Sequence, residues 1–432
     1  MKKILLAGGA GMGNLGDEAL MLSVVQKIKF HIPDAQITIS TPNDDITSWT
    51  IPEIKTVPAM RTAVFGAENG GAYYSANSKF RDHWARIAAL ETKLEDLARI
   101  WAILGMLPHK MQRRLNKIWS KNLNREPLFF DGGGARTFFK ALNETDLVVV
   151  YGGGILTSAT RSRLWEMALL ARLCKAKNIP IIFRSHQIGP IETVEDAQRL
   201  KEIAEISDFI GVRDVGVSAN EFERVTKHRS VEAIDDAFFA DLPKVSIPNL
   251  PEKYIAVAYR AGQTEPADFR DSFARLVASA SDRLQLPLVY VPQGAFDVDA
   301  LHDLKTRVGR EGFVLDFTTL SWAPYEALSN AELAIALPHH SVIFALKGDV
   351  PIISPVHGSY YAAKNRGSMR NFGLEDFVLV YDDNPSSFYE RGLLLLDDVL
   401  PRLDEIKAEF AAKRKDFIQR GEDFDRDFFA II

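Results

Sequence analysis

The chain has 432 residues, and at about 150 residues per domain this length predicts about three domains, or two larger ones that carry an insertion. Hydrophobic residues make up 47% and charged residues 25%, with no apolar run of 18 residues, which excludes intrinsic disorder, a collagen-like fibre and a transmembrane protein. The 52 basic and 57 acidic residues leave a net charge of -5, so we expect no nucleic acid partner and only local anion sites.

The cysteine content and the N-terminus indicate a cytoplasmic protein. Cys174 is the only cysteine, so it can close no internal disulfide and build no cysteine zinc site, and we expect it to be a buried apolar residue. The first apolar run, Ile4–Ala7, ends at two glycines and is too short for the core of a secretory signal. It predicts a first β-strand instead.

The N-terminal part alternates between short apolar runs and amphipathic helices. A strand at Lys3–Ala7 leads into a glycine loop and then into a helix at Glu18–Phe30, whose apolar residues share one face. Further strands are predicted at Gln36–Ser40, Ile54–Val57, Asp146–Tyr151, Ile179–Phe183 and Phe209–Val212, and further helices at about Ser162–Ala176, Val194–Glu205 and Val215–Arg224. Strands that alternate with helices predict a parallel sheet covered on both sides.

Prolines interrupt this pattern near Val245–Glu252, as expected for an interdomain linker, and a second alternating unit begins beyond it. Its predicted strands are Tyr254–Tyr259, Pro287–Val291, Phe313–Asp316, Leu333–Leu337, Pro351–Ser354 and Phe377–Tyr381, and its predicted helices lie near Phe269–Asp282, Val298–Val308 and His340–Leu346. A charged amphipathic helical region follows at about Ser387–Phe429. We therefore predict an α/β fold of two Rossmann-like, doubly wound domains at residues 1–247 and 248–395, with a helical segment at 396–432.

One segment, from about Arg61 to Asn143, fits neither domain because the alternation of strands and helices stops there. Lys79–Leu104 and Lys110–Leu123 both have helical patterns, so we interpret residues 61–143 as a helical insertion in the N-terminal domain. The stretch Lys110–Arg125 holds six basic residues and no acidic one. It is either a solvated face over a packing stripe, which we favour, or a peripheral contact with an anionic membrane or glycolipid.

Gly11–Gly16 matches the pattern G-x-G-x-x-G between a strand and a helix, where glycines and free N–H groups let a bound group approach the backbone. Dinucleotide binding also needs an acidic residue at the tip of the second strand, but Ser40–Pro42 occupies that place. Asp17 and Glu18 would also repel a pyrophosphate from the helix start. The loop therefore suits a neutral hydroxylated ligand, unless its glycines serve only a tight turn.

Further glycines and polar side chains are expected at the carboxyl edge of the first sheet. They lie in the runs Asp131–Gly134, Tyr151–Gly154, Arg184–Pro190 and Arg213–Asp214. Ligands of open α/β sheets bind at this edge, so these residues form a candidate site. The alternative is that each arginine only pairs with a neighbouring carboxylate.

In the second domain, His339, His340 and Ser341 stand between an apolar strand and a helical run. A histidine at a helix start can transfer protons near neutral pH, and the free N–H groups of the helix suit an anion. Neither an H-x-x-x-H pattern nor a nearby carboxylate pair accompanies these histidines, so we expect no metal site.

Taken in order along the chain, these residues resemble the polysaccharide pyruvyl transferase family. Gly13–Ala19 resembles its G-N-x-G-D-E signature, and Asp146–Gly154 resembles its strand and glycine turn. Later blocks match in the same order and extend the resemblance over most of the chain outside the insertion: Gln187–Pro190, Val212–Asp214, Asp236–Phe238, His340–Ala345, Gly348, Val350–Pro351 and Tyr361–Lys364.

The resemblance implies two domains arranged as in GT-B glycosyltransferases, with the active site between them. It implies transfer of the enolpyruvyl or pyruvyl group of phosphoenolpyruvate to hydroxyls of a glycan or lipid-linked sugar, often as a cyclic ketal and without a cofactor. The implied donor contacts are Arg213, His339, His340, Ser341 and Lys364, with His340 acting in acid/base catalysis or stabilising the phosphate. The implied acceptor contacts are Gly13, Asn14, Asp17, Gly153, Gly154, His186 and Gln187.

Two departures from the family pattern concern the donor site. Pro338–His340 stands where the family commonly has Arg-Leu-His, so one phosphate-binding arginine is missing. His339, Lys364, Arg366 or Arg184 could substitute for it, but a histidine or a lysine does not reproduce the bidentate geometry of an arginine. The other departure is Ser218, which lies one residue later than the usual spacing after Arg213–Asp214. A GT-B glycosyltransferase that uses a nucleotide sugar, and a non-catalytic homologue that binds a sugar or an anion, stay open as alternatives, as does a homo-oligomer.

Overall fold

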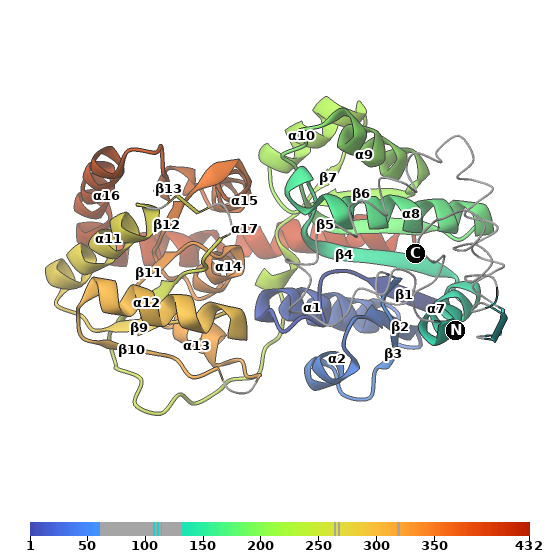
Figure 1. Cartoon of the computed structure of the whole chain (residues 1–432), viewed down its shortest axis with the longest axis horizontal. Helices are drawn as coiled ribbons and strands as arrows, with labels where there is room; N and C mark the ends of the chain where they lie inside the picture. Colours follow the sequence, from blue (N-terminus) through green and yellow to red (C-terminus); the bar gives the residue numbers. More distant parts are fainter. Residues whose placement is uncertain are drawn as a thin grey trace.

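The computed structural model describes residues 1–60, 132–262, 265–266, 268–317 and 320–432, with a few isolated positions between 107 and 114. Two parallel β-sheets flanked by helices form two domains that lie side by side (Figure 1). The first sheet has the strand order β3-β2-β1-β4-β5-β6-β7, and the second has the order β10-β9-β8-β11-β12-β13. Neighbouring strands pair in parallel, which confirms the predicted doubly wound α/β class.

In the N-terminal domain, each predicted strand is present, and the strand β7 and the helices α2 and α7 were not predicted. The strands are β1 (Lys3–Ala7), β2 (Gln36–Thr41), β3 (Lys55–Pro58), β4 (Leu147–Leu156), β5 (Ile181–Ile188), β6 (Phe209–Val212) and β7 (Val231–Glu232). The helices are α1 (Leu15–His31), α2 (Asp44–Thr50), α7 (Gly132–Asn143), α8 (Arg161–Lys177), α9 (Val194–Ile206) and α10 (Val217–Thr226). The predicted helices at 79–104 and 110–123, with their basic stripe, lie outside the described residues apart from isolated positions.

The C-terminal domain likewise contains each predicted strand, and its helices α13 and α15 were not predicted. The strands are β8 (Ile255–Ala258), β9 (Leu288–Tyr290), β10 (Gly312–Val314), β11 (Leu333–Ala336), β12 (Ile352–Val356) and β13 (Val378–Val380). The helices are α11 (Phe269–Leu284), α12 (Val298–Val308), α13 (Ala323–Ser329), α14 (His339–Lys347), α15 (Gly358–Arg370), α16 (Pro385–Val399) and α17 (Leu403–Phe429). Among the described residues, none of the helices combines the length and the apolarity needed to cross a bilayer.

Two glycine runs serve regular structure rather than the turns that we predicted. Gly152–Gly154 continue β4, and a Cβ atom on Gly152 would stand 2.3 Å from the carbonyl oxygen of Ser185 on the neighbouring strand β5. The two strands therefore approach more closely than a side chain would allow. Gly132–Gly134 form the beginning of α7 and not a turn at the sheet edge.

The long helix α17 returns from the second domain to the first and ends near the C-terminus beside its sheet (Figure 1). Arg184 of β5 pairs with Asp425 of α17 and also donates to Asp236 at 2.9 Å, while Phe424 and Phe428 lie 4.9 and 4.5 Å from its guanidinium. Arg184 is completely buried in this cluster. It therefore stabilises the return of α17, and it cannot replace the donor-binding arginine that is missing at position 338.

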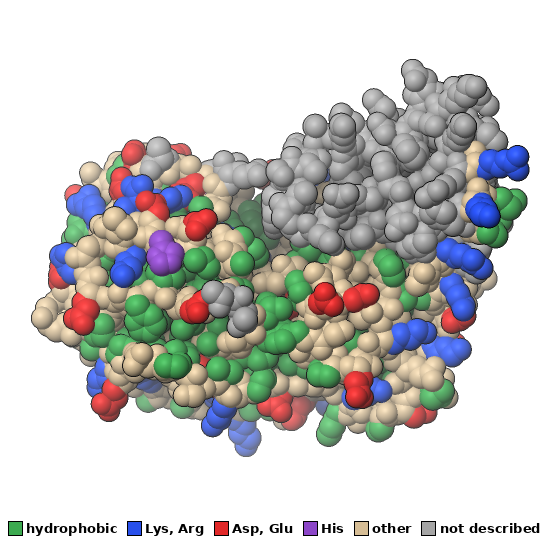
Figure 2. Space-filling model, turned by 60° about the horizontal axis from the view of Figure 1, so that its bottom comes forward, with side chains coloured by type: hydrophobic (Ala, Val, Ile, Leu, Met, Phe, Trp, Pro, Cys, Tyr) green, Lys and Arg blue, Asp and Glu red, His purple; other side chains and the backbone are tan. Residues whose placement is uncertain are grey.

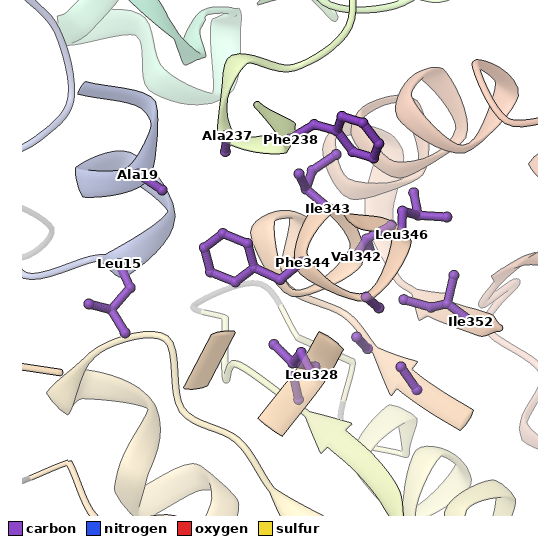
Figure 3. Close-up of a cluster of buried hydrophobic side chains, with 14 of the residues drawn as sticks. Leu15, Ala19, Ala237, Phe238, Leu328, Val342, Ile343, Phe344, Leu346 and Ile352 are labelled. Carbon is purple, nitrogen blue, oxygen red and sulfur yellow. The ribbon is translucent and has the colours of Figure 1, made fainter. Parts of the chain in front are cut away.

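The two domains also share an apolar core. Leu15 and Ala19 of α1 face α14, where Phe344 points toward them (Figure 3). The surface is mixed in charge, with lysine and arginine side chains visible at the outer end of the N-terminal domain (Figure 2). The apolar contact between α1 and α14 fixes how the carboxyl edges of the two sheets meet.

Candidate functional site

The glycine loop before α1 and the start of α14 touch where the two domains meet. The N–H of Leu15 donates to the carbonyl oxygen of Gln293 at 2.9 Å, which links the first domain to the loop after β9. A Cβ atom on Gly16 would stand 2.0 Å from Cγ of His340. The loop that we expected to bind the acceptor and the histidine that we expected at the donor therefore lie in contact.

A buried hydrogen-bonded group lies behind this contact and centres on Asp235. Nη1 of Arg213 donates to Oδ2 of Asp235 at 2.8 Å, and Nη2 donates to Oε1 of Gln187 at 3.1 Å. Nε2 of His339 lies 3.1 Å from the same Oδ2 atom. The sequence singled out Arg213, Gln187 and His339 but not Asp235, which precedes the matching block Asp236–Phe238 by one residue.

Several buried polar atoms at this junction make no hydrogen bond. They are Nε of Arg213, Nδ1 of His339, Nε2 of His340, Oγ of Ser341 and both amide atoms of Gln293. A buried polar group without a partner costs free energy, so such groups in native proteins mark places that a ligand or water satisfies. Because these atoms come from both domains and from strand ends of both sheets, they mark a ligand site between the domains.

Half-buried residues line the other side of this site. Nζ of Lys364 lies 3.2 Å from the hydroxyl of Tyr360, and this hydroxyl donates to the carbonyl oxygen of Gly154 at 3.4 Å. Nδ2 of Asn14 donates to Oδ2 of Asp17 at 2.7 Å. A Cβ atom on Gly153 would lie 4.0 Å from Asp17. The structure thus brings most of the predicted donor and acceptor residues together.

Burial controls the protonation of these groups. Together with the charge of Arg213, it lowers the pKa of Lys364 to about 7. Burial raises the pKa of Asp17, although Lys364 and Arg260 oppose this shift. Burial also lowers the pKa values of His339 and His340 well below 6.5. Arg213 and Arg260, each paired with an aspartate, and Lys364 near its pKa therefore bring three cationic groups to this site.

Four residues of the site were not predicted from the sequence. Arg260 follows β8 and pairs with Asp297 through two hydrogen bonds of 2.7 and 2.9 Å. Gln293 follows β9, and Tyr360 precedes the matching block Tyr361–Lys364. The fourth is Asp235. All four lie just after a predicted strand or beside a matching block. This position along the chain was the signal by which they could have been identified as site residues.

His186 lies beside Gly153 in the paired strands β4 and β5, but its side chain belongs to the interior of the sheet. Its side chain is completely buried, and Nε2 lies 3.1 Å from the carbonyl oxygen of Val150 on β4. Burial lowers its pKa to about 4, so this histidine is neutral at physiological pH. Its contacts belong to the interior of the first sheet.

Two other residues that the sequence related to the donor site lie elsewhere. Arg366 is exposed. The hydroxyl of Ser218 accepts from the N–H of Ile188 at 3.1 Å and so supports the end of β5.

The junction also contains a set of groups that could ligate a metal ion. Asp235, His339 and His340 each offer one ligand atom, and these atoms lie within 4.8 Å of one another. Our expectation of no metal site relied on the lack of a third ligand near the histidines in the sequence. The fold supplies this ligand from a position 104 residues earlier than His339.

Replacing Gly16 by alanine should separate α1 from His340. The added Cβ atom has no room, so either the backbone or the histidine must shift, and we expect the free energy of unfolding to fall by about 1–3 kcal/mol. Gly9 is a suitable control, because a Cβ atom there would stand 3.5 Å from Asp17, an ordinary van der Waals contact. Gly309 has open space around its Cβ position but is unsuitable, because its φ is positive. Urea unfolding of Gly16→Ala and Gly9→Ala measures the difference. Equal stability of the two variants would contradict the tight contact.

The comparisons with known proteins agree with this architecture. No curated protein matches the sequence. The structure is similar to MnaA of Staphylococcus aureus solved with UDP, with 12% identity, coverage of 95% of this chain and 91% of that chain, and a TM-score of 0.54. It is also similar to the trehalose-6-phosphate synthase OtsA, with 10% identity, coverage of 100% and 98%, and a TM-score of 0.52. These similarities show a GT-B-like fold. The family model of polysaccharide pyruvyl transferase matches residues 14–354, so the chain belongs to this family of transferases.

Proposed function

We propose that this protein transfers the pyruvyl group of phosphoenolpyruvate to hydroxyls of a sugar in a polysaccharide or lipid-linked precursor. Family membership supports the reaction class. The observation that carries the choice of donor is the cluster of Arg213, Lys364 and Arg260 around unpartnered buried groups at the start of α14. Phosphoenolpyruvate combines a carboxylate with a phosphate of about -1.5 to -2 charges, and cations with a helix N-terminus bind such a ligand.

The remaining cations offer a replacement for the arginine that is missing at position 338. Arg184 is occupied by Asp236 and Asp425, and Arg366 is exposed. Lys364 and Arg260 both act electrostatically on Asp17 and therefore lie near the acceptor loop and Arg213. In this proposal Arg213 binds one anionic group of the donor, and Lys364 with Arg260 neutralises the other.

The chemistry requires a proton donor at one carbon and a nucleophile at the next. A proton adds to the methylene carbon, the sugar hydroxyl oxygen bonds to the adjacent carbon as it loses its proton, and the bond to phosphate breaks as phosphate leaves. Departure of phosphate leaves this carbon electron-deficient, and a second hydroxyl of the same sugar can then bond to it and lose its proton, which closes the ketal. His340 acts at the donor, as an acid/base group or by stabilising the phosphate, and Asn14 and Asp17 bind the acceptor.

Phosphate release from phosphoenolpyruvate in the presence of sugar acceptors tests the proposal. We expect release that depends on an acceptor, with a product heavier by the pyruvyl group in mass spectrometry. We also expect phosphoenolpyruvate to raise the melting temperature more than UDP does, because a ligand stabilises the state that binds it. Stabilisation by UDP alone, without phosphate release over a broad acceptor panel, would favour a glycosyltransferase that uses a nucleotide sugar.

Lys364 predicts how donor binding depends on pH. Because its pKa lies at about 7, the lysine loses its charge as the pH rises from 7 to 9. The affinity for phosphoenolpyruvate should therefore fall by up to roughly tenfold per pH unit in this range, where the donor phosphate is already ionised. Calorimetric titration at several pH values measures this slope.

The matched comparison for this prediction uses two variants of the same helix. Lys364→Met should bind the donor weakly at pH 7 and show little change up to pH 9. Arg366→Met removes an exposed cation two residues further along and should keep the pH dependence of the wild type. The same slope in Lys364→Met as in the wild type would show that another group titrates.

A further inference from the structure

We propose that Asp235, His339 and His340 form a binding site for a divalent transition metal ion such as Zn²⁺. The three residues are 0%, 2% and 5% exposed, and each offers a ligand atom within 4.8 Å of the others. Nε2 of His340 makes no hydrogen bond in this buried position. A buried nitrogen without a partner on one of these three residues is a second indication that a ligand belongs there.

The distances fit a single ion after a small adjustment. Two ligands of a tetrahedral zinc ion, each about 2.0–2.2 Å from the metal, stand about 3.4 Å apart. Oδ2 of Asp235 and Nε2 of His339 are already 3.1 Å apart, so an ion can take the place of their hydrogen bond without moving either side chain far. The ring of His340 has to approach the other two ligand atoms by up to about 1.4 Å, because the atoms are up to 4.8 Å apart.

The set of ligands leaves room for a further one. Two imidazoles with one carboxylate is a combination found in catalytic zinc sites, where water or substrate takes the fourth position. Asp235 is held in place by hydrogen bonds from Arg213 at 2.8 Å and from the N–H of Ala237 at 3.0 Å, as expected for a ligating carboxylate. The charge of Arg213 opposes the ion, so we expect an anion in the fourth position to strengthen binding.

The ion would serve the donor site. This role rests on the proposed function, whereas the existence of the metal site does not. Position 338 is a proline, which offers no cation to the phosphate of the donor. A metal ion on the neighbouring His339 and His340 would supply positive charge at that place through its open position.

Metal content of the full-length protein without an affinity tag tests the site. The protein is stripped with a chelator, dialysed against Zn²⁺ and then against metal-free buffer, and its zinc is measured by mass spectrometry. We expect about one ion per chain in the wild type and less than about a tenth of that in His339→Ala and His340→Ala. His357→Ala is the matched control, because His357 is also buried with an unpartnered Nε2, and it should keep the ion.

Titration of the stripped protein with Co²⁺ gives a second readout. Visible absorption bands of bound Co²⁺ should appear in the wild type and in His357→Ala and be lost in the other two variants, whose melting curves show whether they are folded. Zinc below a tenth of an equivalent in the wild type, or wild-type binding by folded His339→Ala and His340→Ala, would overturn the site. Phosphate release by a metal-free wild type would overturn only the role of the ion at the donor and would leave the proposed function intact.

Discussion

Glutamine in place of His340 should slow phosphate release from phosphoenolpyruvate by about 100-fold to 10,000-fold, the range that a positioned acid/base group typically contributes. His340 is the second residue of α14, packs on Gly16 across the junction and is 5% exposed, so its ring lies where the two domains meet. Glutamine keeps a polar side chain of similar reach but can neither transfer a proton near neutral pH nor replace an imidazole ligand. Initial rates at saturating donor measure the effect.

Two controls separate this loss of activity from a loss of structure. His357→Gln changes another buried histidine of the same domain, which packs edge-on against Phe269 at 4.9 Å between ring centroids. Its rate should stay within about twofold of the wild type, because its ring packs on Phe269 and Tyr361 and its side chain makes no capping hydrogen bond to α15. Far-ultraviolet circular dichroism and melting curves of both variants establish that they are folded. A folded His340→Gln variant with the wild-type rate would remove His340 from the reaction.

The strands were predictable because strands of a doubly wound sheet are covered by helices on both faces. Such strands are apolar throughout, and the run Phe209–Val212 coincides with β6. Helix α15 was missed for the opposite reason. Tyr360 and Lys364 of this helix contribute to the site and Asn365 bonds to the carbonyl oxygen of Leu337, so the helix has no apolar stripe that a periodicity would reveal.

The partners of the site residues could not be predicted, because they depend on contacts between distant parts of the chain. Arg184 and Arg213 each follow a buried strand, and the sequence gives no reason to treat them differently. In the structure Arg184 meets Asp425, 241 residues away on α17, whereas Arg213 meets Asp235 near the donor histidines. The return of α17 therefore decides which arginine is structural and which lies at the site.

The glycine-loop motif also concealed a buried charge. The sequence predicts that Glu18 repels a pyrophosphate and places it in the family signature, but it does not predict that this side chain is completely buried. Its Oε1 accepts from the N–H of Gly11 at 2.7 Å, and its Oε2 accepts from the hydroxyl of Thr50 at 3.3 Å. Among the described residues, no cation forms a hydrogen bond or an ion pair with this carboxylate. Glu18 therefore holds the loop in place through these hydrogen bonds, but ionising its buried carboxyl costs free energy, and this cost depends on pH.

At pH 8, Glu18→Gln should raise the free energy of unfolding by about 3 kcal/mol. Burial, with a further contribution from the charge of Asp17, raises the pKa of Glu18 from 4.5 to about 7. The native state therefore holds this proton more tightly than the unfolded state does. The stability that results is fully present below pH 4.5 and is lost as the pH rises through about 7, where the buried carboxyl must ionise. Glutamine keeps the acceptor for Gly11, can donate to Thr50 and carries no charge.

Urea unfolding of the wild type and Glu18→Gln at pH 5, 6, 7 and 8 measures this difference, which should be small at pH 5 and grow with pH. Glu332 provides a control of opposite sign, because Lys407 and Lys253 lower its pKa. Glu332→Gln should reduce stability at pH 8, and this loss should shrink as the pH falls toward the pKa of the wild-type carboxyl. A difference between the wild type and Glu18→Gln that stays constant from pH 5 to pH 8 would show that Glu18 is ionised throughout, and that the loop binds the carboxylate more strongly than burial penalises it.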